Sequence, residues 1–201
     1  MEQERQVGVG PHPQPWPTEP HYDPELLAEG DRRNVIDTYR YWTVEAIKDD
    51  LAKSAVSLEI AIENWQHDSN IGTIVRTANA FNVKKVHIIG RRQWNQRGAM
   101  VTNRYMTIEH HPTVEAFLDA VSGKTLLAID NLPGAQPLDK AELPADCVMA
   151  FGGEGPGLSD AMRAACHTMI MIEQFGSTRS VNIGVAAGIL MYEWRRQQSL
   201  L

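Results

Sequence analysis

From residue 56 onward, short apolar runs alternate with amphipathic stretches along the chain. Val56, Leu58 and Ile60 stand at every second position, which is typical of a strand. Four further short apolar runs predict buried strands, and the stretches between them place apolar residues at helical spacing. The predicted strands are 56–62, 86–89, 125–129, 147–151 and 168–172, and the predicted helices are 34–52 (capped by Asn34), 71–81, 113–121 (capped by Thr113), 158–166 and 181–196.

This alternation predicts an α/β fold with a mainly parallel sheet that is flanked by helices and buried on both faces. In such a sheet, ligands bind beyond the carboxyl ends of the strands. The polar and glycine-rich segments 64–70, 130–134, 152–157 and 173–180 fall at those ends. We therefore expect these four loops to build the functional site.

The first 24 residues have a different composition from the rest. They hold six of the eleven prolines and few aliphatic residues, so they cannot bury enough surface to order themselves. Residues 1–30 also carry six acids and only one base. The sequence predicts a disordered, acidic, proline-rich tail over residues 1–24 and a single domain over residues 25–201.

The distribution of charge gives a first indication of the partner. The formal net charge of −6 argues against nucleic acid, because phosphate binders are usually basic. Residues 1–30 account for five of these charges, however, and no acid occurs between Asp68 and Glu109. The bases in this acid-free window are Arg76, Lys84, Lys85, Arg91, Arg92, Arg97 and Arg104. Such a window favours RNA as a partner.

The cysteines and histidines show no metal or disulfide pattern. Cys147 and Cys166 give no disulfide framework, and no histidine is paired with a cysteine at zinc-like spacing. His110 and His111 are interpreted as surface residues, so we expect no metal. We find no signal peptide and no apolar run that could cross a bilayer. The expected location is cytoplasmic, without a membrane partner.

Two arginine-containing segments are candidates for RNA contact. In the first, Asn70 can cap a helix, Gly72 admits another backbone to its first turn, and Arg76 can present its guanidinium to a phosphate. The second is the basic stretch 91–104, whose arginines and aromatic residues suit phosphates and bases. Alone, such features are more often surface arginines and solvated loops. The candidate RNA-binding residues of the second segment are Arg91, Arg92, Arg97 and Arg104.

Two glycine-rich segments are candidates for ligand binding. Residues 152–157 contain four glycines directly after a strand, and Glu154 among them calls for hydrogen-bond partners. Residues 174–188 form a polar loop before a helix that carries Gly184, Ala187 and Gly188 on one face, which permits tight packing. A simple turn and a capped core helix are the alternatives. Neither a phosphate-binding P-loop nor the Gly-x-Ser-x-Gly elbow of hydrolases is present.

Taken in order, three of these segments resemble the motifs of the SpoU/TrmH family of RNA ribose 2′-O-methyltransferases. The first motif matches Asn70-x-Gly72-x-x-x-Arg76. The second matches at Glu154, within 151–159, and the third includes Ser180-Val-Asn182. The resemblance covers about residues 56–194. Departures from the common family pattern stand at Asn82, Glu173, Gln174 and Gly184.

The resemblance implies a fold, a cofactor and an assembly. The fold would be SPOUT-like, with a trefoil knot in its C-terminal part, and S-adenosyl-L-methionine would sit in that knot. Relatives resemble obligate homodimers, which makes 34–52 and 181–196 candidate interface helices. The implied cofactor-binding residues are Asp130, Gly152, Gly153, Ile172, Ser180 and Val181.

The implied reaction is attack of a ribose 2′-oxygen on the donor methyl group. Since arginine is a poor base, Arg76 would orient the RNA phosphate and stabilise the developing alkoxide. Asn70, Glu154 and Asn182 complete the implied catalytic set. The compact chain with its basic loop favours tRNA over rRNA. The alternatives are an rRNA-directed enzyme and a non-catalytic RNA-binding protein with the same fold.

Overall fold

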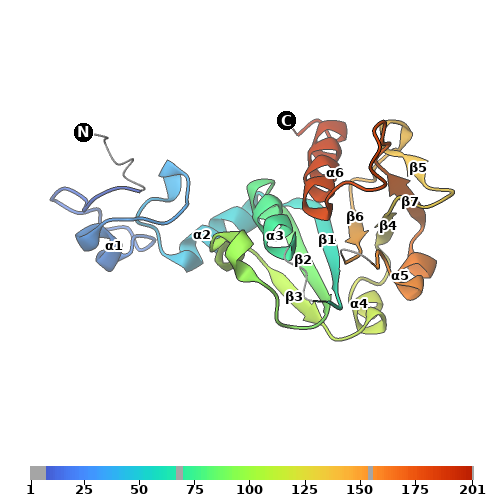
Figure 1. Cartoon of the computed structure of the whole chain (residues 1–201). Coiled ribbons are helices and arrows are strands. Elements are labelled where there is room, and N and C mark those ends of the chain that lie inside the picture. Colours follow the sequence, from blue (N-terminus) through green and yellow to red (C-terminus); the bar gives the residue numbers. More distant parts are fainter. Residues whose placement is uncertain (1–7, 67–69, 154–155, 201) are drawn as a thin grey trace. The chain divides into compact units, whose positions relative to one another are not determined.

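The computed structural model describes residues 8–66, 70–153 and 156–200 (Figure 1). The chain divides into two compact units, Met1–Ser54 and Ala55–Leu201. Within the described ranges, no helix combines the length and apolar character needed to span a membrane.

The described part of the N-terminal unit contains two short helices, α1 (Pro24–Glu29) and α2 (Val44–Lys53), and a 3-10 turn at Asp37–Tyr39. Residues 8–24 lie against later residues of the same unit through the backbone bridges Val9–Asp31 and Tyr22–Trp42. The described part of the predicted tail is therefore in contact with the rest of the unit, and the boundary lies after Ser54 and not at residue 24. Aromatic contacts replace the missing aliphatic residues, since the His21 ring lies 4.2 Å from that of Trp42.

The buried Asp31 carboxylate holds this unit together. Arg33 donates to it through Nε at 2.9 Å and through a terminal guanidinium nitrogen at 2.7 Å, and the backbone N–H of Tyr41 donates at 3.0 Å. Burial raises the pKa of Asp31, but the hydrogen bonds from Arg33 and Tyr41 outweigh it and lower this pKa to about 2. The ionised carboxylate is thus the form that the fold requires.

The helix predicted over 34–52 is wrong in its first half. The helix α2 begins at Val44, and its N-cap is Thr43, whose hydroxyl accepts a hydrogen bond from the backbone N–H of Ala46 at 3.1 Å. Tyr41 has a φ of 64° in the left-handed region, which no α-helix can pass through. Apolar residues continue at helical spacing across this turn, so their spacing alone does not reveal where the helix begins.

In the described part of the C-terminal unit, seven strands form one parallel sheet with the order β3-β2-β1-β6-β4-β7-β5. This confirms the predicted α/β fold with a parallel sheet. The strands are β1 (Val56–Asn64), β2 (Val83–Gly90), β3 (Ile108–His111), β4 (Thr125–Ile129), β5 (Gln136–Pro137), β6 (Cys147–Phe151) and β7 (Thr168–Met171).

The two strands that the sequence did not predict, β3 and β5, are short and lie at the edges of the sheet. Neither contains an apolar run, so their only signal is the pairing that the fold supplies. On β3, His111 is 8% exposed and lies within hydrogen-bond distance of His87. Its interpretation as a surface residue is therefore wrong, because α4 covers this part of the edge with Phe117.

Among the residues that the structure describes, four α-helices flank the sheet: α3 (Asn70–Ala80), α4 (Val114–Ala120), α5 (Asp160–Ala165) and α6 (Ile183–Gln197). Figure 1 shows α3 and α6 on one face and α4 and α5 on the other. Leu58 and Ile60 of β1 enter the core cluster under α3 and α6, whereas Ala61 enters the opposite cluster. Thr113 caps α4, as predicted.

The helices α3 and α6 approach closely because glycines of α6 face threonines of α3. A Cβ atom at Gly184 would lie 3.1 Å from Cγ2 of Thr73, and one at Gly188 would lie 3.7 Å from Cγ2 of Thr77. This confirms the smooth helix face predicted from the sequence. The crossing brings the first and third motifs side by side.

Candidate active site

A cavity of about 420 Å³ opens beyond the carboxyl ends of β4, β6 and β7. The loops after these three strands form it, and the loop after β7 is the one that leads into α6. This is the edge of a parallel sheet at which ligands bind. The lining includes every residue that was predicted to bind the cofactor: Asp130, Gly152, Gly153, Ile172, Ser180 and Val181. The structure thus brings together residues from three separate loops.

Gly152 determines how tightly the loop after β6 folds on itself. A Cβ atom at this position would overlap the carbonyl carbon of Gly157 and the backbone nitrogen of Leu158. These are backbone atoms, which cannot turn aside as a flexible side chain does. Gly153 and Gly157 also form an antiparallel bridge. The sequence predicted that these glycines allow another segment to approach closely. In the structure, the segment that approaches Gly152 is the later part of the same loop.

The Asp130 carboxylate joins two of the loops that form the cavity. One oxygen accepts a hydrogen bond from the backbone N–H of Asn131 at 2.8 Å, and the other accepts from that of Leu158 at 3.4 Å. Asn131 in turn donates through Nδ2 to the carbonyl oxygen of Arg179 at 2.9 Å. The loops after β4 and β6 and the loop before α6 are thereby held in one wall.

Gln174 is a cavity residue that sequence reasoning did not select. Its Nε2 donates to the carbonyl oxygen of Ile172 at 3.4 Å. Its Oε1 is buried and has no hydrogen-bond partner among the described residues. A buried acceptor without a donor is costly, so a ligand in the cavity would supply the missing donor. In the sequence, Gln174 stood out only as a departure from the family pattern.

Glu63 is a second residue that the sequence did not reveal as part of the site. Its side chain is fully buried at the end of β1, and its Oε2 accepts a hydrogen bond from the backbone N–H of Ser159 at 2.7 Å. Its Oε1 accepts from Nε1 of Trp65 at 3.1 Å. This carboxylate fixes the start of α5, and hence the end of the glycine-rich loop, against the central strand.

A hydrogen bond joins the first and third motifs. Nδ2 of Asn182 donates to Oδ1 of Asn70 at 3.0 Å, while Oδ1 of Asn182 accepts from the first backbone N–H groups of α6. Asn182 also lines the cavity. Arg76 is exposed on α3, the same helix that Asn70 begins. Glu154, the fourth member of the predicted catalytic set, lies outside the described residues.

The basic segment after β2 is held beside α3. Nδ2 of Asn64 donates to the carbonyl oxygens of Arg91 at 2.7 Å and Gln93 at 3.0 Å. A Cβ atom at Gly72 would lie 2.9 Å from backbone atoms of Asn95 and Ala99, which confirms the predicted approach of another backbone to this helical turn. The four arginines predicted to bind RNA are all exposed: Arg91, Arg92, Arg97 and Arg104.

Residues 57–192 match the family described as SpoU rRNA Methylase. The chain belongs to the SpoU family. It is 30% identical over 156 residues to an uncharacterized tRNA/rRNA methyltransferase of Mycolicibacterium smegmatis, which covers 73% of this chain and 49% of that protein. An Archaeoglobus fulgidus protein of the same description is 31% identical over 149 residues, with 71% and 66% covered. The chain spans about half the length of the first of these relatives.

Solved structures share the SpoU fold. The TrmH/SpoU tRNA modifying enzyme of A. aeolicus superposes with a TM-score of 0.68 at 22% identity, over 78% of this chain and 82% of that one. A structure described as showing the 2-OH methylation of C/U34 on tRNA has a TM-score of 0.64 at 26% identity, with 71% and 96% covered. AviRb of Streptomyces viridochromogenes, solved with AdoMet, has a TM-score of 0.64 at 23% identity, with 70% and 57% covered.

The two cysteines of this SpoU-family chain do not belong to its candidate chemistry. Within the described residues both are free. Burial raises the pKa of Cys147 to about 12, with a contribution from Asp146. Burial and the nearby Glu63 raise the pKa of Cys166 to about 11. Thiols of this kind stay protonated near neutral pH and are poor nucleophiles.

Proposed function

We propose that this chain transfers a methyl group from S-adenosyl-L-methionine to a ribose 2′-hydroxyl of RNA, with tRNA as the favoured substrate. The observation that carries the proposal is the cavity itself. It gathers all six expected cofactor residues and places them next to Asn182, which is bonded to the helix that bears Arg76. The SpoU family and the AdoMet complex of AviRb support the choice of donor.

The cavity has the properties that this cofactor requires. Its volume lies in the range of small-molecule sites. Its buried Gln174 Oε1 accepts from no described residue, and the amino and hydroxyl groups of the cofactor are donors. Gly152, Asp130 and Ile172 line the cavity together, and the tight turn at Gly152 shapes one of its walls. When bound, the cofactor supplies a methyl group on a sulfonium, which is already a good leaving group.

The protein's own task is to position the 2′-hydroxyl and to stabilise the charge that develops on its oxygen. Arg76 is the group that we assign to this task, because a guanidinium presents several N–H donors in one plane and can hold a phosphate and an alkoxide together. Asn70 and Asn182 fix the start of α3 relative to the cavity. The exposed arginines of segment 91–104 extend the positive surface from α3 along the RNA backbone.

We infer a homodimer with a knotted C-terminal part. An exposed apolar patch supports the dimer: Phe175 is 92% exposed, and Val185 and Tyr192 of α6 are 54% and 53% exposed. A second copy of α6 is a suitable cover for such a patch. The knot is supported by the likeness to the SpoU fold and by the sheet order, in which the later strand β6 lies between β1 and β4.

The decisive experiment measures methyl transfer from labelled S-adenosyl-L-methionine to tRNA and to rRNA. Arg76→Ala is expected to abolish transfer while cofactor binding, followed by calorimetry, stays nearly intact. Arg163→Ala on α5 removes the same charge from another helix and serves as the matched control. An Arg76→Ala variant that keeps its activity contradicts the proposed role.

Nucleoside mass spectrometry of RNA from cells with and without the gene identifies the target. Loss of one 2′-O-methylated nucleoside from tRNA supports the proposal, and its loss from rRNA shows the rRNA-directed alternative. Unchanged ribose methylation, together with no binding of S-adenosyl-L-methionine, favours the non-catalytic RNA-binding protein.

A further inference from the structure

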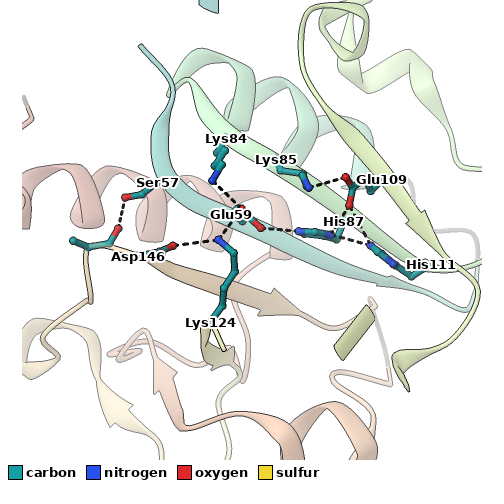
Figure 2. Close-up of polar contacts among 10 residues, drawn as sticks. Ser57, Glu59, Lys84, Lys85, His87, Glu109, His111, Lys124 and Asp146 are labelled. Carbon is teal, nitrogen blue, oxygen red and sulfur yellow. Dashed lines mark hydrogen bonds and ion pairs between the residues drawn. The ribbon is translucent and has the colours of Figure 1, made fainter. Parts of the chain in front are cut away.

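Figure 2 shows a cluster of histidine, carboxylate and lysine side chains on the neighbouring strands β1, β2 and β3. His87 lies on β2, and Glu109 and His111 lie on β3. His87 is 1% exposed, whereas the side chain of Glu109 is 39% exposed. Among the described residues that line the active-site cavity, none belongs to this cluster. The proposed methyl transfer therefore gives it no role.

Three potential ligand atoms of the cluster converge. Nδ1 of His87 lies 2.9 Å from Nε2 of His111, and Oε2 of Glu109 lies 3.8 Å from the first nitrogen and 3.9 Å from the second. One point lies about 2.1 Å from all three atoms, which is the bond length of zinc to nitrogen and oxygen ligands. Tetrahedral zinc holds its ligand atoms about 3.3 Å apart. The two imidazole nitrogens therefore need to separate by about 0.4 Å, and the Glu109 oxygen needs to approach each of them by about 0.5–0.6 Å.

Glu59 on β1 sets the tautomer of His87. Its Oε2 accepts a hydrogen bond from Nε2 of His87 at 2.9 Å, and its Oε1 accepts from Nζ of Lys124 at 2.9 Å. With the proton on Nε2, Nδ1 of His87 presents a lone pair toward His111. A carboxylate behind a ligating histidine is the arrangement that orients histidines in zinc sites.

Glu109 divides its oxygens between a lysine and the two histidines. Its Oε1 lies 2.6 Å from Nζ of Lys85, which leaves Oε2 for the imidazoles. Phe117 of α4 covers the histidines, with its ring centroid 5.2 Å from that of His87 and 5.6 Å from that of His111. The half-exposed Glu109 provides the route from solvent. Acids and lysines balance around the cluster: Glu59, Glu109 and Asp146 face Lys84, Lys85 and Lys124.

We propose that His87, Glu109 and His111 bind one divalent transition-metal ion of the zinc class, with water as the fourth ligand. Two imidazoles and one carboxylate suit such an ion, whereas magnesium and calcium prefer oxygen ligands alone. Binding replaces the hydrogen bond between the imidazoles, and the proton on Nε2 of His111 moves to Nδ1. The ion joins the edge strand β3 to β2, so it stabilises the edge of the sheet.

The test uses the full chain, stripped with EDTA, dialysed, and titrated with Co²⁺ and then with Zn²⁺. Cobalt reports the site through its visible absorption, and zinc is expected to displace it. We expect one ion per chain. We also expect Tm to rise by about 5–10 °C when free Zn²⁺ is 100-fold above its Kd.

Matched variants distinguish this site from other histidines on the surface. Glu109→Ala and His111→Ala each remove one ligand and are expected to weaken binding at least about tenfold. His110→Ala removes an imidazole from the same strand, but this imidazole contacts the carbonyl oxygen of Gly90, so binding should match the unmodified chain. Because Glu109 is half-exposed, its variant folds even where the buried His111 variant does not.

Three results overturn the proposal. The first is the absence of saturable binding of either ion to the unmodified chain. The second is full-strength binding in both Glu109→Ala and His111→Ala, which places the ion elsewhere. The third is a loss of affinity in His110→Ala equal to that in the two ligand variants. Methyl transfer is not measured in this test, so its outcome is independent of the proposed activity.

Discussion

Replacement of Asn182 separates two tasks that one side chain performs. Its Oδ1 caps α6 by accepting from the backbone N–H groups of Gly184 at 3.0 Å and Val185 at 3.3 Å, and its Nδ2 donates to Asn70 at 3.0 Å. Loss of an N-cap costs about 1 kcal/mol. Loss of an exposed hydrogen bond adds about 0.5 kcal/mol. Asn182→Ala should therefore lower the free energy of unfolding by about 1.5 kcal/mol, or Tm by about 3–6 °C.

Asn182→Asp retains the cap and loses only the bond to Asn70. Its carboxylate still accepts from the start of α6, where negative charge is favourable, but it has no hydrogen to donate to Oδ1 of Asn70. We expect a loss of only about 0.5 kcal/mol. Methyl transfer should nevertheless fall by about tenfold or more in both variants, because the start of α3 is no longer fixed to the cavity.

Thermal and urea unfolding measure the stabilities, and a double-mutant cycle with Asn70→Ala isolates the bond between the two side chains. The coupling free energy should be about 0.5 kcal/mol. Equal stabilities of Asn182→Ala and Asn182→Asp would refute the capping geometry. A coupling energy of zero, with unchanged methyl transfer in Asn182→Asp, would refute the positioning role of the bond.

Three further outcomes are expected. Gly152→Ala should abolish binding of S-adenosyl-L-methionine in calorimetry, because the added methyl group overlaps backbone atoms, whereas Gly10→Ala, which meets open space, should not change it. Asp31 has a pKa of about 2 in the folded protein, below its value in the unfolded chain. Its ionised form therefore adds about 2 kcal/mol to the free energy of unfolding above pH 4, and this contribution is lost as the pH falls toward 2. Asp31→Asn should remove this pH dependence from amide exchange in residues 8–54. Val101→Asn should raise the free energy of unfolding by about 1 kcal/mol, because Val101 is half-exposed and holds a φ of 69° that asparagine tolerates better. An unchanged Tm in thermal unfolding would show that Val101 does not strain the backbone.

The sequence predicted the central strands and the cavity well because both depend on local signals. Apolar runs mark β4 and β6 at their observed bounds, since strands buried on both faces have no polar positions to blur them. Strand ends followed by glycine and polar residues marked the loops that line the cavity. These features are encoded within a few residues of each other, so no knowledge of the tertiary structure is needed.

The remaining features depend on contacts between distant segments. The strand β3 has no apolar run, and His111 is buried only because α4 packs over it. Gln174 and Glu63 appear in the sequence as ordinary polar residues. Glu63 accepts from the distant Ser159, and the Oε1 of Gln174 is buried without a partner among the described residues. The start of α2 was predicted wrongly for a different reason. Apolar residues continue at helical spacing through Tyr41, but the left-handed backbone of Tyr41 interrupts the helix itself.

The crossing of α3 and α6 explains how two separate binding tasks can act together. The start of α6 belongs to the cavity wall, and α3 carries Arg76 and supports the arginine-rich segment through Gly72. Gly184 packs against Thr73, so a shift of either helix moves the other. Rigid packing of this kind transmits small displacements. Substitutions at this crossing should therefore weaken cofactor binding and RNA binding together, although neither ligand contacts Thr73 in the proposed arrangement. Independent responses of the two affinities to Thr73→Val would contradict this coupling.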